Sequence, residues 1–233
     1  MSKEKILRDH FESIVYSKSD WTLLNSKRER AIQLLEMFEG LTPYIYGSVA
    51  RGNVHKNSDI DIIFIEPIQS FRIEFILNKN GFMHYFREII MATPKDSIKL
   101  YIYLSELESI TIPLTKLDKK ALEFYDFGGK INLQELKLGI RVPGIDKRLV
   151  FIKPNPRGHE EASIINNEPI VAKELGISIE TLMERKKVLL KREKYGRTGV
   201  YLKREIDINE TTEEVLKKLS NKKAIIRKKL YQR

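Results

Sequence analysis

The sequence predicts an α/β (α+β) protein in which a small mixed sheet is flanked by helices and followed by a basic helical module. Two observations lead to this expectation. Short apolar runs alternate with amphipathic segments up to about residue 125, a pattern typical of a sheet covered by helices. Residues 151–233 then hold 20 Lys and Arg against 12 Asp and Glu, whereas the first 150 hold 22 against 20. We therefore expect a first domain over 1–152 and a basic second domain over 153–233.

The elements of the first domain follow from the spacing of its apolar residues. Gly40 is a plausible end for the second helix, Pro67 ends strand pairing, and Gly81 ends the helix that Ser70 begins. The expected order is a helix over 3–18, a helix over 22–39, two strands and a turn over 42–66, a helix over 70–80, strands over 82–92 and 97–104, and a helix near 116–125.

The second domain begins after the turn at residues 153–158, which contains two prolines and a glycine. A helix over 169–175, a glycine turn and a helix over 179–192 form a helix-turn-helix pattern. The segment 194–203 then resembles the hairpin of a winged helix. In that interpretation nucleic acid contacts the basic residues Arg185, Lys186, Lys187, Lys191, Arg192 and Arg197. The alternative is a helical pair that packs on the first domain and exposes its charges to solvent.

Composition excludes several classes of protein. Cysteine is absent, which excludes disulfides and thiolate metal sites. No run of about 18 apolar residues exists, and the charged start of the chain lacks the apolar core of a signal peptide. We expect a cytoplasmic protein without a membrane partner, and the basic second domain indicates an acidic partner such as nucleic acid.

The most informative motif is a pair of carboxylates at the start of an apolar strand. Asp59 and Asp61 precede Ile62, Ile63 and Phe64. Alternate residues of a strand face the same side. The two carboxylates therefore point toward one place, and their residues are about 7 Å apart along the strand. Like charges held this close repel unless a cation lies between them. Oxygen ligands of this kind predict a site for Mg²⁺ or Mn²⁺.

A glycine turn before this strand provides a place for phosphate. Gly47 allows the backbone to turn, and Ser48 can donate a hydrogen bond from its hydroxyl. Backbone N–H groups at the start of a helix here would face an anion. Arg51 and Lys56 flank the strand and could neutralise triphosphate charge, although a solvated surface position explains either one equally well.

Gly47-Ser48 followed by Asp59-Ile60-Asp61 resembles the signature of the DNA polymerase β-like nucleotidyltransferase superfamily. The three motifs Arg141-Val142-Pro143-Gly144, Gly158-His159-Glu160 and Gly196-Arg197-Thr198-Gly199-Val200 are similar to those of archaeal proteins described as predicted nucleotidyltransferases. The resemblance implies the superfamily's sheet topology, an NTP such as ATP as substrate and a divalent metal as cofactor. It identifies no acceptor.

The resemblance also implies a third carboxylate on a strand reached after a helix. Glu88 fits that order, and Glu74 is the alternative if residues 71–77 form a strand, whereas Glu106 and Glu108 follow the next strand and fit the order less well. An Asp is the commoner residue in this role, so it stays open whether the site is active. The leading hypothesis is a Mg²⁺-dependent transfer of NMP to an acceptor hydroxyl, with nucleic acid favoured as acceptor. The alternatives are a DNA-binding winged-helix regulator whose nucleotidyltransferase-like domain senses nucleotide or binds a partner, and a toxin–antitoxin component.

Overall fold

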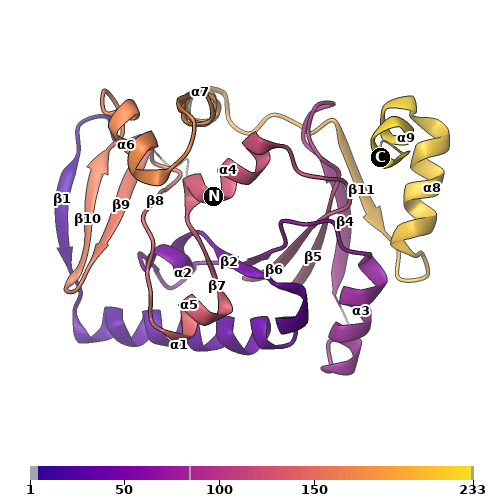
Figure 1. Cartoon of the computed structure of the whole chain (residues 1–233), viewed down its shortest axis with the longest axis horizontal. Helices are drawn as coiled ribbons and strands as arrows, with labels where there is room; N and C mark the ends of the chain where they lie inside the picture. The colour runs from indigo at the N-terminus through magenta and orange to yellow at the C-terminus, as the bar shows by residue number, and fades with distance from the viewer. Residues whose placement is uncertain (1–4, 84, 232–233) are drawn as a thin grey trace.

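The computed structural model describes residues 5–83 and 85–231 and contains a large and a small β-sheet (Figure 1). The large sheet has the order β11-β4-β5-β6-β3-β2-β7, and the small sheet has the order β1-β10-β9-β8. The strands are β1 (Phe11–Val15), β2 (Tyr44–Tyr46), β3 (Ile60–Ile63), β4 (Phe86–Met91), β5 (Lys99–Ser105), β6 (Glu108–Pro113), β7 (Lys130–Asn132), β8 (Gly144–Ile145), β9 (Val150–Asn155), β10 (Gly158–Ser163) and β11 (Leu202–Ile206).

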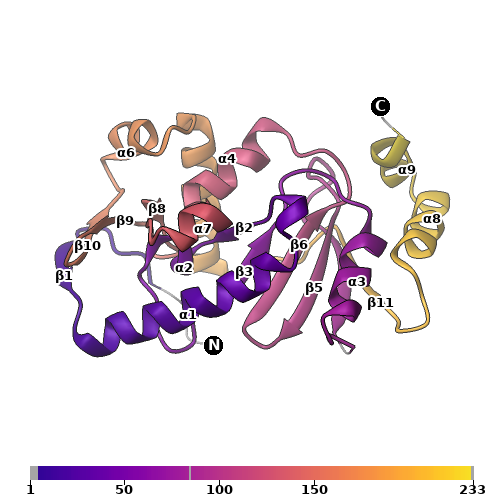
Figure 2. The ribbon, with the colours of Figure 1, turned by 60° about the horizontal axis from the view of Figure 1, so that its bottom comes forward.

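The helices lie on both sides of this arrangement. One long helix, α1, runs along the bottom of Figure 1 beneath both sheets, and Figure 2 shows its full length. The helices are α1 (Lys18–Glu36), the 3₁₀ turn η1 (Glu39–Leu41), α2 (Ser48–Arg51), α3 (Ser70–Lys79), α4 (Lys119–Gly128), α5 (Leu133–Lys137), α6 (Glu168–Leu175), α7 (Ile179–Tyr195), α8 (Thr212–Lys222) and α9 (Ala224–Tyr231). Within the described residues, none of them has the length and apolar character needed to cross a bilayer.

The expected mixed sheet flanked by helices is confirmed. β3 and β6 run parallel, while the other paired strands of the large sheet run antiparallel. Ile45, Ile62 and Ile110 lie side by side on β2, β3 and β6 and are fully buried. They form the main core with apolar residues of α1, α3 and α8. Because side chains alternate along a strand, Asp61 and Ser109 face the opposite side of the sheet.

That opposite face is covered in part by α4. Ile63 of β3 packs with Leu117 and Tyr125 in a separate apolar cluster. Tyr101 and Tyr103 of β5 lie on the same face and stack with ring centroids 6.4 Å apart. The face therefore combines an apolar region under α4 with partly exposed polar and aromatic groups, which is the composition of a binding surface.

The helix predicted over residues 3–18 is wrong within the described residues. Phe11–Val15 forms β1, which pairs antiparallel with β10, and the helix begins only at Lys18. Ser17 accepts a hydrogen bond from the Asp20 N–H, and Asp20 accepts one from the Ser17 N–H. This capping box fixes the helix start. The preceding segment, which contains Ile14 and Val15, can therefore form backbone hydrogen bonds with the edge strand β10.

The predicted wing is also wrong. The helix-turn-helix pair is present as α6 and α7, separated by Gly176 in the left-handed region at φ 65°. The following segment forms no hairpin, since its strand β11 pairs with β4 at the edge of the large sheet. Leu202 and Ile206 of β11 are buried in the main core. Burial of these apolar residues outweighs the local hairpin signal.

The domain boundary predicted between residues 152 and 153 falls inside β9. Strand pairing crosses it in both sheets, because β1 pairs with β10 and β11 pairs with β4. Apolar residues of α6 and α7 pack with Phe127 of α4 and Phe151 of β9. The basic C-terminal residues thus belong to the same packed body as the large sheet.

A chain truncated after Tyr195 should therefore not retain the fold. Truncation removes Leu202, Ile206, Val215 and Ile226 from the main core, and each buried aliphatic side chain contributes about 1.5–3 kcal/mol. Circular dichroism and urea unfolding should show loss of the cooperative transition. A truncated chain that unfolds cooperatively near the full-length midpoint would instead support an independent C-terminal module.

Candidate active site

The turn between β2 and β3 has a backbone that only glycine adopts easily. Gly47 has φ 83° and ψ −140°, and Gly52, which ends the four-residue helix α2, has φ 101°. Glycine has no Cβ to clash in this region. The Gly47 N–H donates to the Gly129 carbonyl over 2.9 Å. Helix geometry leaves the N–H groups of Ser48 and Val49 without partners inside α2, so the turn can receive an anionic group.

The acid pair lies directly beside this turn. Asp61 is the second residue of β3 and pairs with Tyr46, the last residue of β2. Asp59 precedes the strand and is exposed. The Ser109 hydroxyl of β6 donates to Asp61 Oδ1 over 2.7 Å. The predicted turn and both predicted aspartates thus meet at one end of β3.

Electrostatics at this end favour a cation. Burial raises the pKa of Asp61, and the charge of Asp59 raises it further, whereas the Ser109 hydrogen bond and Lys147 lower it. The two carboxylates are therefore close enough to repel. Carboxylate and hydroxyl oxygens are hard ligands, so Asp59, Asp61 and Ser109 fit a divalent ion such as Mg²⁺ or Mn²⁺.

Glu88 does not join the acid pair. In register, Asp61 is opposite Ser109 of β6, Ser109 is opposite Tyr103 of β5, and Tyr103 is opposite Phe86 of β4. Glu88 lies two residues beyond Phe86, so at least three strand spacings, about 14 Å, separate it from Asp61. Its carboxylate instead accepts from the Tyr103 hydroxyl at 2.7 Å and pairs with Lys203 at 2.8 Å.

The other acidic residues considered for this role are engaged elsewhere. Glu74 lies on α3, next to the core face, and forms an ion pair with Arg87 at 2.8 Å. Glu108 pairs with Arg30 of α1 at 2.7 Å. Across from Asp61 on β6 lies Ser109 and not a carboxylate.

Arg51 has a different role from the predicted contact with nucleotide. Its side chain is buried, and its guanidinium donates to the Gly128 carbonyl and to Asn53 Oδ1. These contacts tie α2 to the end of α4, which makes Arg51 a positioning residue. Lys56 lies exposed in the loop before β3, where it stays a predicted nucleotide contact.

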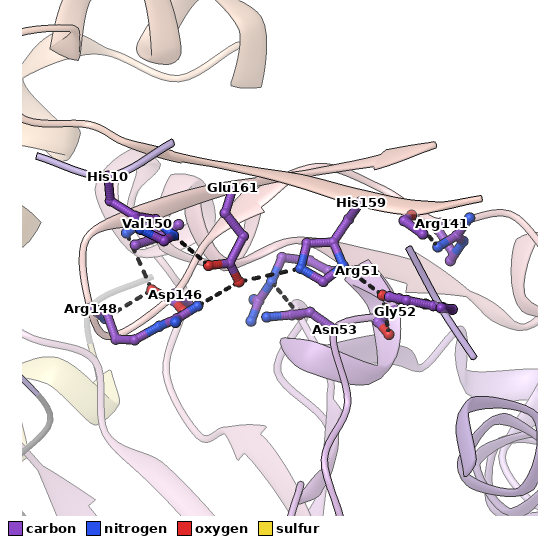
Figure 3. A network of polar contacts seen from close by, with 12 residues as sticks. His10, Arg51, Gly52, Asn53, Arg141, Asp146, Arg148, Val150, His159 and Glu161 are labelled. Atoms are coloured by element: carbon purple, nitrogen blue, oxygen red, sulfur yellow. Dashed lines mark hydrogen bonds and ion pairs between the residues drawn. The ribbon is translucent and has the colours of Figure 1, made fainter. Parts of the chain in front are cut away.

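A polar network holds the other end of α2, and Figure 3 shows its members between the small sheet and α2. The Tyr16 hydroxyl donates to the Gly52 carbonyl over 2.8 Å and lies 2.7 Å from His159 Nδ1. His159 Nε2 lies 3.2 Å from Glu161 Oε1, which also accepts from Arg148 at 2.7 Å. We call these residues, with Arg51, the clamp. Sequence reasoning missed the clamp, although the motif Gly158-His159-Glu160 was its visible part.

Glu161 of the clamp also forms a group of possible metal ligands with two neighbouring residues, His10 and Glu12, and the ligand atoms of the three lie within 4.8 Å of one another. Glu161 already accepts hydrogen bonds from His10, His159 and Arg148. The Arg148 guanidinium would also repel a cation. These ion pairs explain the cluster, so we assign it no metal.

The residues predicted to bind nucleic acid, which lie on α7 except for Arg197 just after it, divide into two sets. Arg185 turns inward, with its guanidinium carbon 4.5 Å from the Phe124 ring centroid of α4. Lys186 pairs with Glu168. The remaining members are exposed: Lys187, Lys191, Arg192 and Arg197. These four keep a nucleic-acid role as a prediction.

Comparison with known proteins agrees with this geometry. Residues 30–125 match the family model of the nucleotidyltransferase domain. The match supports the DNA polymerase β-like superfamily for this segment. It includes the turn at Gly47, both aspartates and Ser109, but it ends before most of the clamp and α7. No curated protein and no solved structure matches the chain.

Replacing the half-buried carboxylate of Asp61 with a neutral amide should stabilise the metal-free protein. Because the folded-state pKa of Asp61 is raised, its ionised form opposes folding at neutral pH. Asp61→Asn removes the charge and can still accept from Ser109, so we expect a higher melting temperature in EDTA. The matched control is Asp59→Asn at the exposed neighbour, for which we expect a smaller change. A lower melting temperature for Asp61→Asn would contradict this account of the site.

The clamp should weaken in acid. Burial alone would raise the pKa of Glu161, but hydrogen bonds from His159, Arg148 and His10 outweigh it and lower the pKa to about 2. A depressed carboxylate pKa stabilises the fold above its unfolded value, and this stability is lost as pH falls through the folded value. The shift corresponds to at most about 3 kcal/mol.

The measurement is the free energy of urea unfolding for the wild type and Glu161→Gln between pH 7 and pH 2.5. The wild type should be more stable above about pH 5, where Glu is ionised in both states, and the difference should shrink toward pH 2.5. A difference that is constant across this range would exclude the Glu161 charge as its source.

Proposed function

We propose that this protein is a divalent-metal-dependent nucleotidyltransferase that transfers NMP from an NTP to a hydroxyl of a nucleic acid. The observation that carries the proposal is the acid pair beside the glycine turn, within the segment that matches the nucleotidyltransferase domain. The turn suits the triphosphate, and the partly exposed face of the sheet leaves room for an acceptor.

In the proposed reaction, the triphosphate lies against Gly47 and Ser48. The acceptor oxygen attacks the α-phosphorus and forms a new phosphoester bond, while the bond to the bridging oxygen breaks and pyrophosphate leaves with the electron pair. Asp61, whose pKa is raised, is the carboxylate better suited to accept the hydroxyl proton. Mg²⁺ or Mn²⁺ held by Asp59 and Asp61 would neutralise the phosphate charge.

One observation favours a second function. Ser109, and not a carboxylate, lies across from Asp61, and Glu88 lies three strands away. A site with two acids can bind a metal–nucleotide complex without turning it over. The alternative is therefore a regulator that senses nucleotide or binds a partner, with the basic face of α7 as its contact with DNA.

Label transfer separates these functions. The wild type is incubated with α-³²P-labelled NTPs, Mg²⁺ and total RNA or DNA, beside Asp61→Asn. An enzyme should label an acceptor and release pyrophosphate, and Asp61→Asn or EDTA should reduce labelling by at least about a hundredfold. Asp207→Asn is the matched control, because it removes an exposed aspartate beyond β11 and outside the site and should leave labelling unchanged. Nucleotide binding without labelling of any acceptor would reject the enzyme and favour the sensor.

A further inference from the structure

Two cations near α7 form no ion pair with any of the described residues. Lys99 is the first residue of β5, and Arg185 projects from α7 over α4. Lys99 Nζ donates to the Tyr125 hydroxyl at 3.1 Å and lies 5.8 Å from the Phe124 ring centroid. Arg185 Nε is fully buried and has no hydrogen-bond partner. Both cations thus approach the same aromatic side chain.

The positive charges of Lys99 and Arg185 are not neutralised by a neighbouring carboxylate among the described residues. Within the described residues, no carboxylate oxygen forms an ion pair with either side chain, although Asp96 attracts both from a longer range, as do Asp118 for Lys99 and Glu184 for Arg185. Burial lowers the pKa of Lys99, and the Arg185 charge lowers it further. Both side chains are only partly exposed, and charges withdrawn from water in proteins are normally paired. Two unpaired cations that repel each other indicate a place for an anion.

Two tyrosines connect this place with the acid pair. Lys99 donates to the Tyr125 hydroxyl, and the charge of Asp61 raises the pKa of that same hydroxyl. Tyr46 pairs with Asp61 across the sheet, and Arg185 and Asp61 act on its pKa with opposite signs. The cations and the acids therefore border one surface, at opposite ends of the sheet face.

The phosphate turn lies at the acid end of this surface. Lys99 lies two strands from β3 and four residues beyond the position opposite Ser109, which places its backbone about 13 Å along the strands from the Asp61 row. A triphosphate bound at Gly47 and Ser48 would therefore lie too far from Lys99 and Arg185 to be their ligand. These two cations are available to bind a different phosphate group.

The basic residues continue outward along α7. Arg192 lies seven residues, or two helical turns, beyond Arg185 on the same side of the helix, and its charge lowers the pKa of Arg185. No ion pair engages Lys187, Lys191 or Arg192 in the described part of the chain, and all three are exposed. A strip of basic residues that leads from two half-buried cations to exposed ones suits a polyanion that enters the surface end first.

We propose that Lys99 and Arg185 bind a backbone phosphate of a single-stranded nucleic-acid acceptor and so position its terminal hydroxyl toward Asp61. This proposal rests on the proposed function and deepens it by naming how the acceptor is held. Phe124, which is partly exposed beside the cations, offers aromatic surface for a base, and cations next to an aromatic ring are a combination that binds single-stranded nucleic acids.

The test measures acceptor and nucleotide binding separately. Fluorescence anisotropy with a labelled six-nucleotide RNA follows the acceptor, and calorimetry with Mg²⁺ and a non-hydrolysable ATP analogue follows the nucleotide. Lys99→Met and Arg185→Gln should each weaken RNA binding at least tenfold and change ATP-analogue affinity less than twofold. Each should also reduce the slope of log affinity against log salt by about 0.7, as expected for one lost phosphate contact.

The matched controls remove the same charges elsewhere. Lys119→Met lies on the exposed side of α4, and Arg72→Gln lies exposed on α3, which covers the other face. Both should change RNA affinity less than twofold. Melting temperature provides a second readout, because removal of an unpaired buried charge should leave stability unchanged or raise it.

Three results would overturn the proposal: undetectable RNA binding by the wild type, equal weakening by the controls, or weakening of ATP-analogue binding alone. The last would assign the cations to the NTP. Asp61→Asn distinguishes failure of the proposed function, since it should impair the metal–nucleotide complex while RNA binding persists. RNA binding that depends on Lys99 and Arg185 without any label transfer would reject the transferase and retain the nucleic-acid site.

Discussion

The position of α2 is the constraint on which the rest of the site depends. A helix of four residues cannot hold its own shape in water, so contacts from other elements must fix it. The Gly129 carbonyl receives the N–H at its start, Arg51 ties it to α4, and Tyr16 holds the Gly52 carbonyl at its end. Through Tyr16 and His159 the small sheet, which lies outside the matched segment, supports the turn beside the acid pair.

The functional face of the large sheet carries charges that folding alone does not neutralise. Asp61 is crowded by Asp59 at one end, and Lys99 is crowded by Arg185 at the other. Each arrangement opposes folding and persists because the apolar core on the reverse face is large. Separated acids and cations on one surface match a ligand that brings a metal to one end and phosphate to the other. The charges on this face are thus complementary to those of such a ligand.

The sequence predicted the local parts of the structure and failed where distant segments decide. The Gly47 turn, the strand of Asp61 and the helix from Ser70 follow from nearby residues, and each is present. The residues near 11–15 and 202–206 locally favour a helix and a hairpin, respectively. They form strands because they pair with the edges of β10 and β4, which are distant in the sequence. Glu88 fitted the expected order of elements, but strand order, which the sequence did not provide, separates it from Asp61. Arg185 could be identified as basic but not as inward-facing.

The pairing of β1 with β10 also orders events during synthesis. Tyr16 and His159 are separated by 143 residues, so the ribosome releases the glycine turn long before it releases the residue that completes the clamp. Contacts between such distant segments form slowly because the intervening loop must close first. Until then only the contacts with Gly128, Gly129 and Tyr16 hold α2, and the small sheet adds no support. Full support of the glycine turn is thereby delayed until most of the protein has been made.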